Sequence, residues 1–286
     1  MGPGLDWRPA PPGAAAGPWP PLLVAGDLLD AGVVAACSGR AGGRSAAPYA
    51  SLNLGLRVGD DPRAALANRR RVATVLGLAG WPWATVRQVH GAAVVRVRRD
   101  RLGAGPPEAM PPLAEADALV TGDAGVLLAV LAADCAPVLL ADPGARVVGA
   151  AHAGWRGLAA GVVEAAVAEL AALGADPART VALVGPAIGG CCYEVGEEVL
   201  AAVGGRYPAA LRTSRAGRPA VDPAAAAAEA LARAGVGQIR VAEECTADHA
   251  ERFFSHRRDR GRTGRQAGLV ALAPGAVAVA PLGAAR

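Results

Sequence analysis

Apolar residues in the middle of the chain come in short runs that are separated by polar turns. Residues 126–133, 137–141 and 146–151 are such runs, and the turn-like tripeptide at 142–144 (DPG) lies between the last two. Apolar runs of this length, bounded by Gly, Pro or Asp, are typical of buried β-strands joined by tight turns. The pattern therefore predicts a series of consecutive strands in this region.

Helical periodicity follows these strands. Between residues 158 and 173 apolar side chains recur every three or four positions, and a glycine then interrupts the pattern. That spacing puts the apolar side chains on one face of a helix. A further strand is expected at 180–184. Asp222 followed by Pro223 is typical of a helix start, here of the Ala-rich segment 224–234.

This order of elements predicts an α+β fold, in which a mixed β-sheet sandwich is flanked by helices. The chain has 286 residues, and 52% of them are apolar, which is enough to bury one large core. Residues 1–20 are rich in Pro and Gly and are expected to form a disordered leader, and residues 103–112 a surface loop. We therefore expect a single domain over residues 21–286.

Composition limits the partners of the chain. Only 19% of residues are charged and the net charge is +4. This small excess is spread along the chain, which argues against a nucleic-acid-binding surface. No apolar run is long and charge-free enough to cross a bilayer, and the start of the chain lacks the pattern of an export signal. The 5 cysteines show no disulfide spacing, which favours a reducing compartment. We therefore expect a cytoplasmic protein without membrane or nucleic-acid partners.

Three segments share a pattern with chemical meaning: an apolar strand leads into a residue that can bind a metal, and a tight turn follows. These residues are His90, Cys135 and His152. We expect them to converge, because the ends of neighbouring strands meet at one edge of a sheet. Two imidazoles and one thiolate suit zinc, and three protein ligands leave a fourth position for water or substrate. The sequence therefore predicts a catalytic metal site at these residues.

Each of these features also has a structural interpretation. A single cysteine at a strand end is more often a small buried side chain, and a single histidine is more often only hydrogen-bonded. The helix that carries Arg69 has either a solvated basic face or an arginine that binds phosphate. The polar stretch 254–266 is either a charged surface loop or a segment that closes over the site. For Cys191 and Cys192, packing is the expected role.

Together the motifs over residues 39–272 resemble the laccase-domain family, also called the YfiH/YlmD-like purine nucleoside phosphorylase family and peptidoglycan editing factors. The segments that carry the resemblance are 48–55, 58–62, 68–69, 88–91 (QVHG), 116–120 (ADALV), 133–135 (ADC), 152–157 (HAGWRG), 185–189 (GPAIG), 193–196 (YEVG) and 245–246 (CT). The family's fold is in turn similar to that of the cytotoxic necrotizing factor deamidases.

The resemblance implies Zn²⁺, with Cu²⁺ as an alternative, at the predicted His–Cys–His site. It also implies phosphorolysis of adenosine, inosine, guanosine and methylthioadenosine, with deamination of adenosine. The partners would be purine nucleosides and phosphate, and the protein a monomer or homodimer. Arg69 is similar to the family's arginine near phosphate or nucleoside, and we expect Asn53 and Arg57 to contact substrate. Relatives often carry His where this chain has Arg57. Asp134 and Glu194 are the candidates for a general acid.

Other functions fit the same residues. Cys135 as a nucleophile with His152 as its base would suit an amidase that edits peptidoglycan precursors. Two His and one Cys also suit a copper site of a polyphenol oxidase, although the 4 histidines of the chain cannot in addition supply a multicopper cluster. A binding module without enzymatic activity is the remaining possibility.

Overall fold

Two six-stranded β-sheets pack face to face in the computed structural model, which describes residues 5–8, 20–102 and 106–274. The first sheet has the order β1 (Leu5–Arg8), β2 (Leu22–Ala25), β3 (Val33–Ser38), β14 (Gln266–Leu272), β7 (Leu127–Ala132) and β4 (Trp83–Ala84). The second has the order β13 (Gln238–Val241), β10 (Val181–Val184), β8 (Ala136–Asp142), β9 (Val147–Ala153), β6 (Ala118–Thr121) and β5 (Val94–Arg96). Both are mixed, because β4 runs parallel to β7, β13 to β10 and β5 to β6, while the other neighbours are antiparallel.

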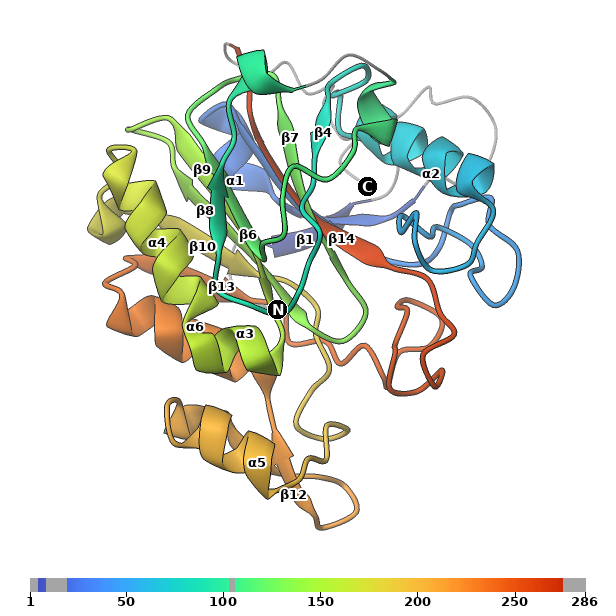
Figure 1. Cartoon of the computed structure of the whole chain (residues 1–286), viewed down its shortest axis with the longest axis vertical. Helices are drawn as coiled ribbons and strands as arrows, with labels where there is room; N and C mark the ends of the chain where they lie inside the picture. Colours follow the sequence, from blue (N-terminus) through green and yellow to red (C-terminus); the bar gives the residue numbers. More distant parts are fainter. Residues whose placement is uncertain (1–4, 9–19, 103–105, 275–286) are drawn as a thin grey trace, which may run out of the picture.

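Helices cover the outer face of each sheet (Figure 1). The helices of the described fold are α1 (Gly26–Asp30), α2 (Pro62–Val75), α3 (Trp155–Ala160), α4 (Val162–Ala172), α5 (Glu197–Val199) and α6 (Pro223–Arg233), with short helical turns at Arg99–Arg101, Pro107–Ala109, Pro177–Arg179, Leu200–Gly204 and Pro208–Ala210. Helices α3, α4 and α6 lie against the second sheet, and α2 lies against the first. None of the helices in the described residues is both long and apolar enough to cross a membrane.

Side-chain alternation along β7 produces this layering. Leu127 and Ala129 pack with α2 on the outer face of the first sheet, whereas Leu128 and Val130 point into the core between the two sheets. Successive side chains of a strand point to opposite faces, so a strand that is buried on both faces is continuously apolar. The expected α+β sandwich flanked by helices is therefore confirmed.

Side-chain caps fix the starts of two helices, and the one at Asp222 is the helix start that the sequence predicted. The side chain of Asp61 accepts a hydrogen bond from Arg63 N at the start of α2, and that of Asp222 accepts one from Ala225 N at the start of α6. The helix expected at 158–173 differs, because Gly161 at φ +85° divides it into α3 and α4. A left-handed residue cannot continue an α-helix, so α3 is a short, separate helix after β9.

The start of the chain corrects one expectation. Residues Leu5–Arg8 were expected to be disordered, but they form β1 and pair antiparallel with β2, with Leu5 buried. The rest of the proposed leader, residues 1–4 and 9–19, lies outside the described residues. In the segment expected to be a surface loop, residues 103–105 are not described, while Glu108 and Met110 are buried beside a helical turn.

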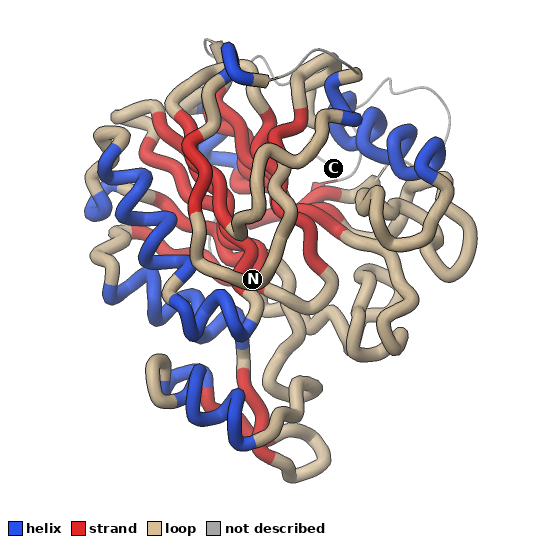
Figure 2. The backbone as a smooth tube through the Cα atoms, viewed as in Figure 1, coloured by secondary structure: helices blue, strands red, loops and turns tan. Residues whose placement is uncertain are grey.

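A small outlying unit completes the described fold. Strands β11 (Leu211–Thr213) and β12 (Pro219–Val221) form a two-stranded sheet. Figure 2 shows this hairpin and α5 as a protrusion beside the two-sheet body. Tyr207, just before the hairpin, is buried and its hydroxyl contacts Leu158 O and Glu164, which ties the protrusion to α3 and α4.

Candidate active site

The structure brings His90, Cys135 and His152 together. One donor atom of each residue lies within 4.8 Å of the other two, and the two imidazole rings meet edge to face with their centroids 4.9 Å apart. Histidine nitrogen and cysteine sulfur are typical ligands of zinc and of copper. The arrangement is therefore a candidate metal site.

Sheet register explains why residues so distant in sequence meet. Cys135 lies in the turn between β7 and β8, where Asp134 has φ +95°. His152 is the next-to-last residue of β9 and pairs with Pro137 of β8, so it faces the end of that turn. His90 lies in the loop before β5, at φ +59°. Cys135 thus follows a strand and lies in a tight turn as expected, whereas His152 lies inside a strand and His90 is preceded only by an isolated bridge at Arg87.

Gly154 gives the site the space it needs. A Cβ on this residue would lie 2.7 Å from His90 Nδ1 and 2.9 Å from Cys135 Sγ. Contacts this short would force the two side chains apart. This glycine, two residues after His152, therefore lets the chain approach the other two ligand residues.

Asp117, which had no role assigned from the sequence, contacts His152 and the backbone on either side of His90. Its Oδ1 lies 2.9 Å from His152 Nδ1, and its Oδ2 accepts hydrogen bonds from Gly91 N at 2.7 Å and Val89 N at 3.1 Å. A carboxylate on Nδ1 leaves the Nε2 of His152 as the free donor atom. In the sequence, Asp117 is a single acidic residue at the start of an apolar strand, and no nearby residue indicates that it contacts His152.

Interactions between the Cys135 thiol and the neighbouring imidazole rings shift the pKa values of Cys135 and His152. Burial alone would raise the pKa of Cys135, but His152 and His90 outweigh it by charge and hydrogen bonding and lower this pKa to about 6. Burial alone would lower the pKa of His152, but Cys135 and Asp117 outweigh it and raise this pKa to about 9. In the metal-free protein, Cys135 is therefore a thiolate and His152 an imidazolium at neutral pH.

A pocket of about 550 Å³ lies near the site and is lined by arginines. Arg57, Arg69, Arg87 and Arg265 all contribute to its wall. The three donors do not line it, but Gln88 does, two residues before His90. The charge of Arg265 also acts on Cys135, which places this pocket within electrostatic reach of the donors.

Arg69 is not part of a solvated helix face. It is 3% exposed, its Nε donates to Leu54 O and its Nη1 to Glu108 O, each at 2.9 Å, and its guanidinium stacks over Trp83. Burial lowers its pKa to about 10, so it stays positive at neutral pH. Arg69 thus presents a fixed charge to the pocket, which fits the phosphate-binding alternative.

Asn53 was expected to contact substrate, but its side chain lies inside the protein. It is fully buried, donates to Gly55 O and the Asp60 carboxylate, and accepts from Gly55 N and Arg265 N. Its side chain has no exposed surface for a ligand, so we reassign it as the residue that positions Arg265. Arg57, by contrast, lines the pocket and is exposed.

The two candidate general acids, Asp134 and Glu194, both accept hydrogen bonds from other groups of the protein. Asp134 accepts from Thr246 Oγ1 at 2.7 Å and from Arg257 N at 2.6 Å, and Glu194 accepts from Ser214 and Arg218. Because Arg257 N donates to Asp134, the polar stretch 254–266 packs on the turn that carries Cys135 and is not only a charged surface loop.

The fold and the site together define an α+β sandwich with a candidate metal site at the ends of its central strands and an arginine-lined pocket beside it. The chain belongs to the family described as multi-copper polyphenol oxidoreductase laccase, whose sequence model matches residues 34–273. This confirms the family resemblance.

Similar proteins are known by sequence and by structure. A Streptomyces coelicolor protein named purine nucleoside phosphorylase is 50% identical over 231 residues, which cover 81% of this chain and 92% of that one. The Geobacillus stearothermophilus purine nucleoside phosphorylase YlmD is 40% identical over 251 residues, with 84% and 90% covered. The crystal structure of YlmD from that organism matches with a TM-score of 0.81 at 38% identity, covering 93% of this chain and 99% of that one. The Bacillus licheniformis hypothetical protein YfiH matches with a TM-score of 0.80 at 34% identity, covering 88% and 96%.

Proposed function

We propose that this protein is a zinc-dependent purine nucleoside phosphorylase that acts on adenosine, inosine, guanosine and methylthioadenosine, and that also deaminates adenosine. The observation that carries the proposal is the meeting of two imidazoles and one thiolate beside a pocket with fixed positive charge. The names of relatives that are 40% and 50% identical support it.

The donor set fits a catalytic zinc ion. His90, Cys135 and His152 provide three donors, which leaves a fourth position for substrate or water. Asp117 orients His152 from behind, as carboxylates do for histidine ligands of zinc. When bound, the ion would supply a Lewis acid that polarises an oxygen of phosphate or water.

Phosphate is the substrate group that the pocket suits best. Arg57 and Arg69 are among the residues that line it, and guanidinium groups match phosphate oxygens in shape and charge. A volume of about 550 Å³ is in the range of small-molecule sites. In the reaction, a phosphate oxygen bonds to C1′ as the bond from C1′ to the purine nitrogen breaks, and the purine leaves with the electron pair and takes up a proton. The arginines hold the phosphate in place for this displacement.

The test is chromatography of adenosine and inosine incubated with the zinc-loaded protein, with and without phosphate. We expect free base and ribose 1-phosphate only when phosphate is present, and inosine from adenosine in either case. Cys135→Ala should abolish both products, while the control Cys37→Ala changes a buried cysteine outside the site. Unchanged turnover by Cys135→Ala would contradict the proposal.

A second candidate is a thiol hydrolase, which one observation favours. Cys135, with its pKa of about 6, His152 and Asp117 lie in the order nucleophile, base and orienting carboxylate. This mechanism predicts full amide hydrolysis after a chelator has removed the metal, and loss of activity on alkylation of Cys135. Loss of activity with the chelator and recovery with zinc would exclude it.

A multicopper oxidase is a weaker fit to the described residues. The cluster offers two histidines, and the other two in the chain, His249 and His256, belong to neither group of metal-binding side chains found in the described part of the fold. Oxygen consumption with a phenol by the copper-loaded protein would reverse this assignment.

A further inference from the structure

A second group of metal-binding side chains lies apart from the first. Cys191, Cys192, Cys245 and Asp248 each offer one ligand atom, and these atoms all lie within 4.8 Å of one another. None of the three cysteines has a disulfide partner, and all three are partly exposed. Packing alone, the role expected from the sequence for Cys191 and Cys192, does not explain three thiols and a carboxylate in one place.

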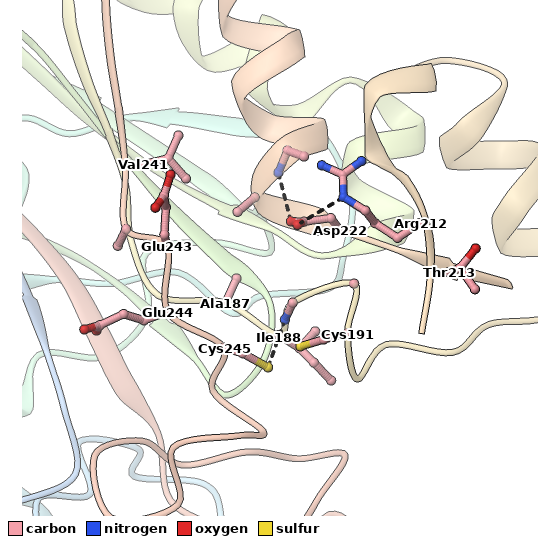
Figure 3. Close-up of a pocket in the computed structure, with 15 residues that line it drawn as sticks. Ala187, Ile188, Cys191, Arg212, Thr213, Asp222, Val241, Glu243, Glu244 and Cys245 are labelled. Carbon is pink, nitrogen blue, oxygen red and sulfur yellow. Dashed lines mark hydrogen bonds and ion pairs between the residues drawn. The ribbon is translucent and has the colours of Figure 1, made fainter. Parts of the chain in front are cut away.

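The two loops that carry these residues follow neighbouring parallel strands. Cys191 and Cys192 come after β10, and Cys245 and Asp248 come after β13. Parallel strands leave their loops at the same edge of a sheet, and a bridge between Ala187 and Cys245 continues the pairing. In Figure 3 the sulfurs of Cys191 and Cys245 lie close together at one end of a pocket. That pocket, of about 530 Å³, gives an ion a path from solvent.

The distances between the ligand atoms suit an ion with tetrahedral coordination. Cys191 Sγ and Cys192 Sγ are 3.5 Å apart, and Cys192 Sγ is 3.9 Å from an oxygen of Asp248. Four ligands at zinc bond lengths lie about 3.8 Å from one another when a cysteine sulfur is about 2.3 Å from the ion. The side chains would therefore need only small movements to bind it.

Backbone and charge also favour the arrangement. Gly189 N donates to Cys245 Sγ at 3.2 Å, and a Cβ at Gly189 would lie 3.2 Å from Cys191 Sγ and 3.6 Å from Cys245 Sγ. A glycine here lets the two loops close on the sulfurs. Arg215 pairs with both oxygens of Asp248 and supplies positive charge next to an anionic ligand set.

We propose that Cys191, Cys192, Cys245 and Asp248 bind a second Zn²⁺, and that this ion has a structural role. Four protein ligands would fill its coordination sphere and leave no place for substrate. The loops it would join also support the candidate active site. Thr246 donates to the Asp134 side chain at 2.7 Å, and Ile188 N donates to Asp134 O at 2.8 Å, next to Cys135. The inference stands independently of the proposed enzymatic activity.

The metal content of reduced, zinc-loaded protein tests this, measured by mass spectrometry of the elements after removal of loosely bound metal. We expect two zinc ions per chain in the unmodified protein and in Cys37→Ala. One ion should remain in Cys245→Ser and one in Cys135→Ala, and none in the combined variant. Two ions in Cys245→Ser, or none in Cys135→Ala, would overturn the proposal.

A second measurement starts from Cys135→Ala, in which the new site is unmodified, so its main result does not depend on whether Cys245→Ser folds. In Cys135→Ala, zinc should protect three thiols from a thiol-reactive dye, and cobalt in place of zinc should give the near-ultraviolet absorption of thiolate ligands. The variant Cys192→Ser in the same background should lose both signals. Equal dye reactivity with and without zinc would contradict the second site.

Discussion

Asp117 and His152 are joined by a buried hydrogen bond of 2.9 Å between Oδ1 and Nδ1. The same carboxylate also accepts from Gly91 N, next to His90. Burial would raise the pKa of Asp117, but His152 and these backbone amides outweigh it and lower the pKa. One ionised carboxylate thus orients the ring of His152 and holds the backbone on either side of His90.

Removing the charge of Asp117 should weaken metal binding while the fold persists. We expect Asp117→Asn to reduce zinc affinity by about 10- to 100-fold, because an amide orients the histidine less strongly than a carboxylate does. Competition with a coloured chelator measures this affinity. Asp123→Asn is a matched control, since the Asp123 side chain accepts from Arg99 N and its backbone N–H donates to Thr121 Oγ1, both away from the site. Equal affinity in the two variants would contradict the positioning role.

The reactivity of Cys135 should depend on pH in a way that an ordinary thiol does not. The thiolate is the reactive form, so alkylation of the metal-free protein should rise with pH, reach half its maximum near pH 6 and then level off. His152→Ala removes the partner that lowers this pKa, so the midpoint should move upward. Mass spectrometry of each cysteine gives the site-specific rates. A midpoint for Cys135 near that of an unperturbed thiol, about 8.5, would contradict the coupling.

Phosphate recognition should depend on Arg57. We expect Arg57→Ala to raise the KM for phosphate by about 10- to 100-fold with a smaller change in kcat, since one charge-assisted hydrogen bond contributes about 1.5 to 3 kcal/mol. Arg63→Ala is the control, because Arg63 is exposed at the start of α2 and does not line the pocket. Steady-state kinetics at varied phosphate concentration separates the two variants. A KM that changes equally in both would show that Arg57 has no specific role.

The space at Gly154 should be required for the site but not for the fold. Gly154→Ala places a Cβ within 3 Å of His90 and Cys135, so we expect loss of bound zinc and of turnover. Gly154 has φ −80°, which alanine adopts without strain. Gly196→Ala, where an added Cβ meets nothing within 4 Å, should retain both properties. Full zinc content in Gly154→Ala would contradict this geometry.

The sequence allowed much of the fold and the core of the site to be predicted, because both depend on local patterns. The apolar runs around Cys135 and His152 define a hairpin, and the pairing of β8 and β9 follows from its tight turn. The caps at Asp61 and Asp222 are also local signals. These features need no knowledge of distant contacts.

Features that depend on distant contacts were missed. The role of Asp117 exists only because β6 pairs with β9, which brings residues 35 positions apart into contact. Strand β1 is four residues long and gains its order from β2, so its own sequence gives little signal. The burial of Arg69 could have been predicted from the sequence, because Arg69 lies with Ala65 and Val72 in the i, i+3, i+4 stripe of buried residues on α2.

The most direct test of the central claim is anomalous diffraction at the zinc absorption edge from crystals of the zinc-loaded, active protein. We predict a peak bonded to Cys135 Sγ at about 2.3 Å and to one nitrogen each of His90 and His152 at about 2.0 to 2.1 Å. An active protein whose crystals show no metal bonded to these three atoms would contradict the account.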